Sequence, residues 1–430
     1  MSVTHRSLSV AVESAFGSLS ASTGLPDNSG LTYTSIPCER DPIVVYGDPV
    51  VSERNDARDG SYGLPPEPDT VWSSGARVQR RTGQISLRLD LTTIGSAANN
   101  YDSNYLGYLL GAGLLTAKHS VSLDPVSSVS DVNTFTPTTT STNYAVGAIL
   151  GAELNGRAEY SAVTDNDVSG DVTVSPAFSA GFTGTPTLRL MQTWFPGSRS
   201  VLGDRTHSLS FRVDGVNFRS YAYGCVLESL ALSLDNGRVM ADLTYQAALI
   251  QDDHGNAVGP IEPTYNSGAP AFFRGSYVVV SDAAPTSLTN ATTGDTLGRV
   301  ALDVEDFSFT ITNTLTPLGH SNSLLAMSDM EITDVDVELS LTLSTANSSL
   351  NSDFFNRQLR QVLVGMGPVG DGLGAAVMIP AAYLTGDASK YEVGGNDIVR
   401  QQLTYKASRF GGDVSESGAG NSPVRIALGV

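Results

Sequence analysis

Apolar and polar residues alternate strictly in one stretch late in the chain. Val335, Val337, Leu339, Leu341 and Leu343 occupy every second position. A period of two places these residues on one face of a β-strand and the intervening residues on the other. The stretch therefore predicts a strand with one buried face and one wet face.

A polar loop over residues 344–349 follows this strand, and an apolar pattern resumes after it. Its residues are Phe354, Phe355, Leu359, Val362 and Leu363. Ser349 or Ser352 can cap the N-terminus of a helix, and Gly365 with Pro368 can end it. The pattern predicts an amphipathic helix directly after the strand.

The same design occurs earlier in the chain. Ile85, Leu87, Leu89 and Leu91 alternate with polar residues, and a helix-like run over 105–110 follows. A shift of 250 positions aligns Ile85 with Val335. We interpret the two stretches as strand-loop-helix units on two sides of one sheet-based core. Two unrelated amphipathic strands, each followed by a helix, are the alternative.

Turn signals predict two hairpins between these units. The first turn contains Asp214-Gly215, and the second is Asp235-Asn236-Gly237. Asn-Gly tolerates the positive φ values of a tight hairpin turn, so the second signal is the stronger one. Later alternating runs predict strands over 307–313, 375–384 and 398–405.

Short apolar runs over residues 145–190 predict a small β-barrel inserted into the larger fold. Asn155-Gly156 is its clearest turn signal, and Val172 and Val174 mark one of its strands. The Ser- and Thr-rich stretch 126–143 before it is typical of a link between domains.

Both ends of the chain have compositions that favour irregular structure. Residues 25–75 are rich in Pro, Gly and Asp, so we expect loop there apart from a strand at 43–46. This loop either wraps a neighbouring subunit or lies free on the surface. The segment 411–423 is flexible in composition. The apolar run 424–430 either adds a strand to a neighbour's sheet edge or is a disordered terminus.

Composition changes this picture mainly through charge. The 430 residues carry a formal net charge of −19, with 43 Gly and 20 Pro. Abundant Gly, Pro, Ser and Thr favour strands and turns over helix bundles. The acidic balance argues against a nucleic-acid binder, which needs a basic footprint. It permits a surface that nucleic acid passes without adhering, although acidity also serves solubility alone.

The chemistry-bearing residues form no recognisable catalytic or metal site. The two cysteines, Cys38 and Cys225, make neither a disulfide framework nor a zinc set, and we expect Cys225 to be buried. The five histidines are dispersed, and no phosphate loop or nucleophile elbow is present. We therefore predict no cofactor and no enzymatic activity, although scattered carboxylates leave a glycosidase pair open.

One acidic loop resembles the opening of a calcium site. Asp165, Asp167 and Asp171 have suitable spacing, but the twelfth position is Pro176, where a bidentate Glu is required. A turn between strands explains these residues as well. The apolar stretch 105–117 is too short to cross a membrane, and no secretory signal begins the sequence. We expect a soluble protein made in a cytoplasm.

The order of these pieces resembles a known family. The stretches that carry the resemblance are Gly83-Gln-Ile-Ser-Leu-Arg-Leu-Asp90, Tyr105-Leu-Gly-Tyr-Leu-Leu-Gly-Ala112, Val172-Thr-Val-Ser-Pro176, Tyr223-Gly-Cys-Val-Leu-Glu-Ser-Leu-Ala-Leu-Ser-Leu-Asp-Asn-Gly-Arg238 and Phe307-Ser-Phe-Thr-Ile-Thr-Asn313. Together they resemble the major tail tube protein of long-tailed (siphovirus-type) phages. The resemblance spans about residues 78–405. The segments before and after it depart from the compact plan of the family.

The resemblance implies a mainly β fold: sandwich- or barrel-like antiparallel sheets with flanking α-helices and an inserted small β-barrel module. We expect five segments: an N-terminal arm and long loop (1–77), the first half of a tube domain (78–125), a linker with the β module (126–200), the remainder of the tube domain (201–410) and a C-terminal tail (411–430).

The resemblance also implies partners. Six copies close into a ring, and rings stack into a tail tube around a tape-measure protein, between tail terminator and distal tail proteins. Phage DNA later passes through the lumen without specific binding, so the protein belongs in the virion tail after assembly in the host cytoplasm. Closing a ring would remove the open sheet edges.

Charge suggests which residues face the lumen. Asp334, Asp336 and Glu338 lie at polar positions of a long strand, and an acidic inner face repels phosphates. Bulk solvent is the alternative surrounding for them. The apolar positions Ile85 to Leu91 and Val335 to Leu343 are the candidate sheet core and assembly residues. A tail fibre or receptor-binding protein and a β-rich polysaccharide-acting enzyme are the alternative functions.

Overall fold

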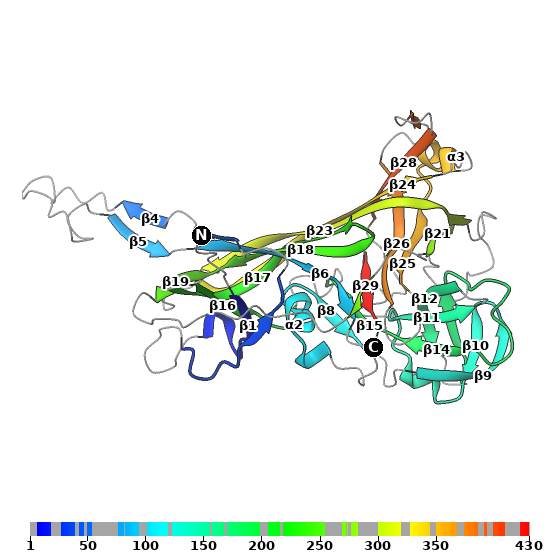
Figure 1. The fold of residues 1–430 in the computed structure, drawn as a ribbon, viewed down its shortest axis with the longest axis horizontal. Helices are drawn as coiled ribbons and strands as arrows, with labels where there is room; N and C mark the ends of the chain where they lie inside the picture. Colours follow the sequence, from blue (N-terminus) through cyan, green and yellow to red (C-terminus); the bar gives the residue numbers. More distant parts are fainter. Residues whose placement is uncertain are drawn as a thin grey trace, which may run out of the picture.

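The computed structural model describes residues 7–18, 27–38, 43–46, 50–53, 76–80, 82–93, 101–118, 123–154, 157–166, 170–197, 205–215, 218–253, 269–271, 273, 277–282, 300–319, 327–344, 350–367, 374–385, 391–393, 399–408 and 422–429. Antiparallel strands dominate it, as predicted, and short helices flank them (Figure 1). The mainly β fold class and the inserted barrel are confirmed.

The main sheet is long, antiparallel and twisted. Its described strands run in the order β3-β6-β18-β17-β23-β24-β28-β27. Their bounds are β3 (Ile43–Tyr46), β6 (Gly83–Asp90), β17 (Phe218–Asp235), β18 (Arg238–Ala247), β23 (Val304–Gly319), β24 (Met327–Leu343), β27 (Tyr391–Val393) and β28 (Val399–Ala407). Both predicted strand repeats, β6 and β24, therefore lie in one sheet.

A second layer packs against the apolar face of the main sheet. Its order is β8-β15-β29-β26-β25-β21-β22. The bounds are β8 (Leu115–Ala117), β15 (Gln192–Phe195), β29 (Arg425–Leu428), β26 (Ala375–Leu384), β25 (Arg360–Met366), β21 (Tyr277–Asp282) and β22 (Val300–Leu302). One apolar cluster fills the space between the layers, so burial of apolar area stabilises both.

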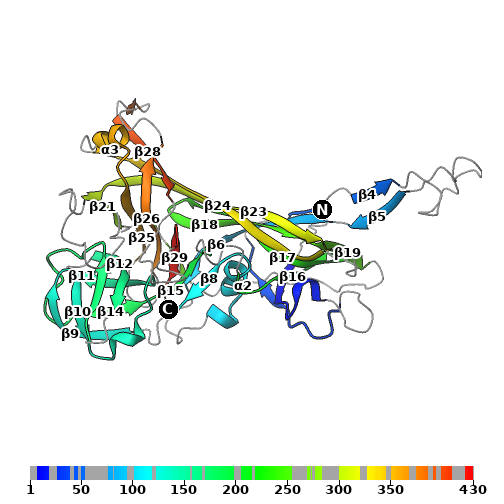
Figure 2. The same cartoon turned by 180° about the vertical axis from the view of Figure 1, so that it is seen from behind.

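Shorter sheets complete the framework. The first half of β17 joins a sheet of β2 (Thr34–Ile36), β1 (Ser7–Val12), β16 (Leu209–Gly215) and β19 (Leu249–Asp253). Two small pairs are β4 (Val50–Glu53) with β5 (Ala76–Arg80) and β7 (Thr92–Thr93) with β20 (Ala269–Pro270). The β4–β5 pair stands apart from the body in both views (Figures 1 and 2).

A closed barrel lies at the other end of the molecule from that pair (Figures 1 and 2). Its strands are β10 (Thr134–Pro137), β13 (Val172–Ser175), β12 (Arg157–Asn166), β11 (Ile149–Leu154), β14 (Thr187–Leu190) and β9 (Leu123–Asp131). The barrel has its own apolar core and docks on the second layer through Tyr160, whose hydroxyl donates to Met366 O at 3.0 Å and Gly367 O at 2.8 Å.

The helices are short. Among the described residues the α-helices are α2 (Tyr105–Gly111) and α3 (Asn351–Asn356), and the 3-10 turns are η1 (Phe16–Ser18), η2 (Tyr101–Ser103) and η3 (Ser141–Asn143). Asn104 caps α2 by accepting from Leu106 N at 2.9 Å. Tyr245 fixes α2 beneath the main sheet by donating to Leu109 O at 2.9 Å.

The helix predicted after β24 is mostly wrong. It ends at Asn356 because Arg357 adopts the left-handed conformation, with φ 49° and ψ 42°. Val362 and Leu363 belong instead to β25, whose residues are all buried between β21 and β26. A strand buried on both faces is continuously apolar, so the sequence could not separate it from a helix.

Three further expectations need correction. The stretch 126–143, predicted as a link, largely forms barrel strands β9 and β10, because Ser and Thr occupy the wet face of the barrel. The apolar run 424–430 contains β29, which pairs within the chain between β15 and β26 and so is neither a neighbour's strand nor disordered. The predicted loop 25–75 contains β2 and β4 besides the expected β3.

The turn prediction at Asn236-Gly237 is confirmed. Asn236 and Gly237 both have positive φ, 52° and 81°, in the turn that joins β17 to β18. Strand β26 matches its predicted range, and Cys225 is buried.

The first predicted turn is misplaced: Asp214 and Gly215 belong to β16, where they pair with Arg219 and Phe218. The third turn signal, Asn155-Gly156, lies outside the described residues.

A buried carboxylate ties the first strand to this framework. Glu13 accepts hydrogen bonds from Gly17 N at 2.9 Å, Gly224 N at 2.9 Å and Ser208 Oγ at 2.6 Å. Burial raises its pKa to about 7, although these hydrogen bonds favour the charged form and oppose the shift. Glu13 thereby holds η1 against the β16–β17 junction.

Replacing a core residue of β24 with a charge tests the predicted buried face. Leu339 is buried, so we expect Leu339→Asp to lower the unfolding free energy by about 4 kcal/mol or more, because the new carboxylate has no partner. Ser308→Asp, on the exposed face of neighbouring β23, should change it by less than about 1 kcal/mol. Denaturant unfolding measures both, and equal effects would contradict the assigned faces.

The shifted pKa of Glu13 predicts a pH dependence. The folded state holds the proton more tightly than the unfolded state, whose ordinary value is 4.5. The contribution of Glu13 to stability is therefore full below pH 4.5 and falls as the pH rises toward 7. Relative to Glu13→Gln, the unmodified protein should lose up to about 3 kcal/mol over this interval. A difference that stays constant with pH would contradict this assignment.

Candidate functional site

The outer face of the main sheet is the candidate site, and β24 carries its acidic residues. Asp334, Asp336 and Glu338 are exposed there. The opposite face of the two repeat strands is apolar and turned toward the core. Eight of the nine predicted core residues are buried, and Val335 is half-buried: Ile85, Leu87, Leu89, Leu91, Val335, Val337, Leu339, Leu341 and Leu343.

A β-bulge at Thr333 keeps this division of faces where β24 passes from Ile332 to Asp334. Ile332 pairs with Leu315 and Asp334 pairs with Thr314, so Thr333 is an extra residue in the ladder. Without it, Ile332 and Asp334 would share a face. The bulge lets Ile332 and Val335 both contact the apolar core while Asp334 stays in solvent.

The carboxylates of Asp336 and Glu338 have polar residues opposite them on the neighbouring strands. Asp336 is opposite Thr312, and Glu338 is opposite Thr310 on one side and Lys406 on the other. Lys406 Nζ contacts Asp336 Oδ2 at 3.0 Å, and this hydrogen bond raises the pKa of Lys406. The pair is exposed, so it contributes little to stability but reduces the local negative charge.

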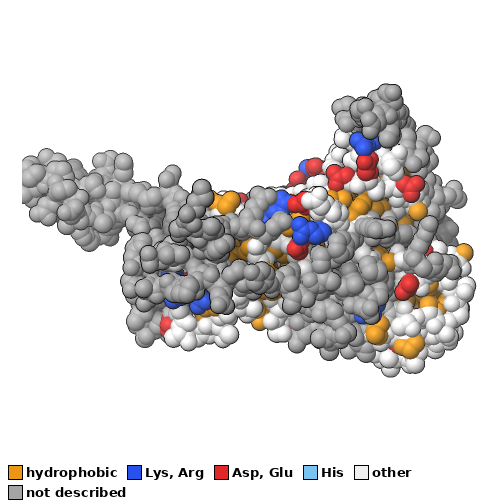
Figure 3. Space-filling model, viewed as in Figure 1, with side chains coloured by type: hydrophobic (Ala, Val, Ile, Leu, Met, Phe, Trp, Pro, Cys, Tyr) orange, Lys and Arg blue, Asp and Glu red, His pale blue; other side chains and the backbone are white. Residues whose placement is uncertain are grey.

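Two arginines lie on the same outer face, on strands β6 and β18. Arg88 Nη2 lies 3.2 Å from Asp235 Oδ2, and Arg238 Nη1 lies 3.1 Å from Asp90 Oδ1. Acidic and basic side chains accordingly sit next to each other over the middle of the molecule (Figure 3). The spacing of polar residues indicated the acids, but these cations were not predicted, although Arg88 and Lys406 occupy polar positions of alternating strands.

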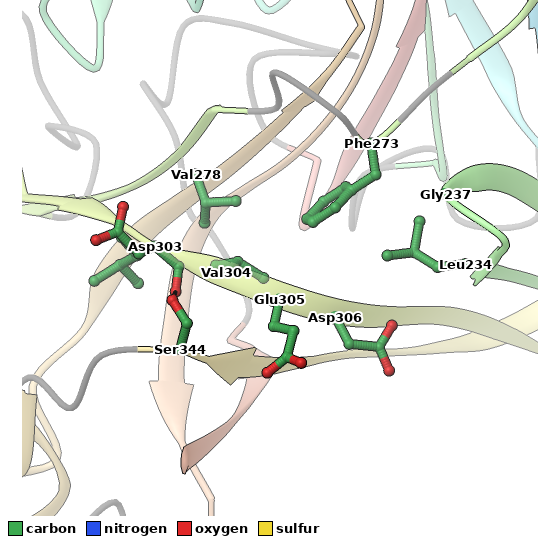
Figure 4. Close-up of a pocket in the computed structure, with 10 residues that line it drawn as sticks. Leu234, Gly237, Phe273, Val278, Asp303, Val304, Glu305, Asp306 and Ser344 are labelled. Atoms are coloured by element: carbon green, nitrogen blue, oxygen red, sulfur yellow. Dashed lines mark hydrogen bonds between the residues drawn. The ribbon is translucent and has the colours of Figure 1, made fainter. Parts of the chain in front are cut away.

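A hollow of about 580 Å³ lies where β22 meets β23. Phe273, Val278 and Leu234 form its apolar part, and acidic residues follow along β23. The carboxylates of Glu305 and Asp306 project from the strand on the side away from Phe273 and Val278 (Figure 4). Glu305 also accepts two hydrogen bonds from Arg400, at 2.7 and 2.5 Å. The hollow thus presents no converging pair of carboxylates.

The acidic loop after β12 gains no support as a calcium site. Asp167 lies outside the described residues, and Asp171 accepts a hydrogen bond from Thr136 Oγ1 at 2.7 Å. The described part of the chain contains no cluster of three or more His, Cys, Asp or Glu side chains that could hold a metal ion. Within that same part, no helix is long and apolar enough to span a membrane.

Comparison with known families decides the class of protein. The family model described as phage tail tube protein matches residues 116–407, which is more than half of the chain. The chain belongs to the phage tail tube protein family. No curated protein matches the sequence.

The tail tube match covers most of the main sheet but not its first strands. It includes the barrel, β17, β18, β23, β24 and β28, and so contains the three acidic residues of the outer face. The strand β6 and the helix α2 precede it, although β6 pairs along its whole length with β18. The family is structural, and its members are components of the virion tail.

Proposed function

We propose that copies of this tail tube protein close into rings, that the rings stack, and that the resulting tube conducts phage DNA during ejection. The family match carries this proposal. The resemblance noted in the sequence implies six copies in each ring and a tape-measure protein in the lumen. It also implies tail terminator and distal tail proteins at the ends of the tube.

The open ends of the main sheet support ring formation. Among the described strands, β3 pairs only with β6, and β27 pairs only with β28. Each leaves one edge with unpaired backbone donors and acceptors. Such edges invite pairing with another chain, and a closed ring satisfies them all.

The outer face of the main sheet suits a DNA conduit. Its exposed Ser and Thr side chains are neutral, and Asp334, Asp336 and Glu338 add negative charge at one end. We assign these three residues to the lumen, where their charge would repel phosphates and prevent adhesion. The pairing of Asp336 with Lys406 moderates this field without removing it.

Electron microscopy of the purified protein tests the proposed assembly. We expect hollow rings or tubes in negative stain, over a range of salt concentrations, because apolar burial and edge pairing resist screening. Monomers alone, or elongated trimers of the kind that fibres form, would overturn the proposal and favour the fibre alternative.

Neutralising the three acids tests the lumen assignment. Tubes of Asp334→Asn, Asp336→Asn, Glu338→Gln should retain more short double-stranded DNA than unmodified tubes. The excess should shrink as salt screens the charges. A control variant, Asp131→Asn with Glu153→Gln, removes two carboxylates at exposed barrel positions and should bind no more DNA than the unmodified protein. Equal binding by all three would show that these acids do not face the lumen.

A further inference from the structure

The main sheet is built from two equivalent groups of four strands. The first group is β3-β6-β18-β17, and the second is β23-β24-β28-β27. In each group two strands that precede a hairpin in the chain come first, and the two strands of that hairpin follow in reversed order; β23 and β24 are consecutive, whereas the small β4–β5 pair lies between β3 and β6. Such agreement in strand order is the mark of an internal duplication.

The sequence supports the same division. Strand β18 contains Leu243-Thr244-Tyr245-Gln246-Ala247, and β28 contains Leu403-Thr404-Tyr405-Lys406-Ala407. Both tyrosines are buried beside the helix of their own group. Tyr245 donates to α2, and the charges of the buried Asp353–Arg360 pair at α3 act on Tyr405, whose pKa burial raises.

The structure also corrects the alignment of the two repeat strands. Tyr245 lies opposite Ile85, and Tyr405 lies opposite Leu339, so Ile85 corresponds to Leu339. The shift is therefore 254 positions, and the predicted shift of 250, which aligned Ile85 with Val335, is wrong by four residues along the strand. The corrected alignment matches Ser86 and Leu87 with Ser340 and Leu341.

The two groups are related as neighbours in a ring would be. From β6 to β24 there are four antiparallel pairings, so the two strands run in the same direction. A rotation about a ring axis preserves strand direction, whereas a two-fold axis perpendicular to the sheet would reverse it. The pairing of β17 with β23 is thus a ring contact that already exists within one chain.

That internal contact defines the register for a contact between chains. Leu232 lies opposite Phe309 at the β17–β23 junction, and Ser233 lies opposite Ser308. By strand pairing, the positions that correspond to Leu232 and Ser233 are Tyr391 and Glu392 on β27. Those that correspond to Phe309 and Ser308 are Val44 and Ile43 on β3.

We infer that β27 of one copy pairs with β3 of the next copy, with Tyr391 opposite Val44, and that each chain fills two positions of the ring. This rests on the proposed tube function. A ring of six positions is then closed by three chains instead of six. The partner of the open β3 edge is a second copy of this chain.

The side chains of β3 fit this role. Ile43 and Val45 are large apolar residues with 55% and 50% of their surface exposed. They stand at positions where the equivalent strand β23 has Ser308 and Thr310. An uncharged apolar edge strand is an aggregation hazard unless another strand covers it. Pairing with β27 covers the edge and extends the sheet.

A disulfide trap tests the register and the number of chains together. In a Cys38→Ser background, rings of Val44→Cys, Tyr391→Cys should oxidise to covalent oligomers on a non-reducing gel, ending at three chains. Opposed positions of an antiparallel pair lie within disulfide range. The control Tyr46→Cys, Tyr391→Cys is displaced by two residues along the strand, about 7 Å, and should give at least about tenfold less cross-linking.

The mass of intact rings gives a second readout without substitutions. Native mass spectrometry should find three times the chain mass of 45.1 kDa per ring. Rings of six chains, or cross-linked ladders that continue past three, would overturn the inference of two positions per chain. Rings in which Val44→Cys, Tyr391→Cys fails to cross-link would overturn the β27–β3 contact alone. Absence of any ring would overturn the proposed function as well.

Discussion

The backbone groups at the two ends of the main sheet are the constraint on which the rest of the structure depends. Inside the sheet, each strand is paired on both sides, and its apolar residues pack on the second layer. At β3 and β27 the ladder stops, and among the described residues no element of the same chain continues it. A protein with such ends must protect them or use them. The exposed Ile43 and Val45 show that this chain does not protect β3 with charge.

How much the sequence predicts depends on how many faces of an element are buried. Strands with one wet face, such as β6, β18 and β24, show a period of two and were predicted well. The strand β25 is buried on both faces, so its continuous apolar run was mistaken for part of a helix. The terminal strand β29 is equally buried, and only its partners β15 and β26, distant in sequence, give it a structure.

The candidate site shows the same limit. The acids of β24 could be placed on the wet face from their spacing alone. Their counterion Lys406 lies 70 residues away, and no local pattern connects it with Asp336. The sequence revealed the repeat but not the alignment of its two strands, because a strand pattern with a period of two aligns equally well at every second position. Only the pairing of Tyr245 and Tyr405 with their opposite strands fixed it.

The two groups of four strands differ in what is attached to them. The barrel is inserted between β8 and β15 of the first half, whereas β25 and β26 of the second half follow each other closely in sequence. Yet the barrel docks on the second half, where Tyr160 and Met191 pack with Leu363 and Met378. Strand β29 also bridges β15 and β26.

Three ties therefore join the halves within a chain: the β17–β23 pairing, the bridging strand and the docked barrel. The proposed contact between chains consists of strand pairing alone, that of β27 with β3. A ring built this way would assemble from preformed double units, because the stronger junction forms during folding of the single chain. Such a ring would carry one barrel for every two ring positions.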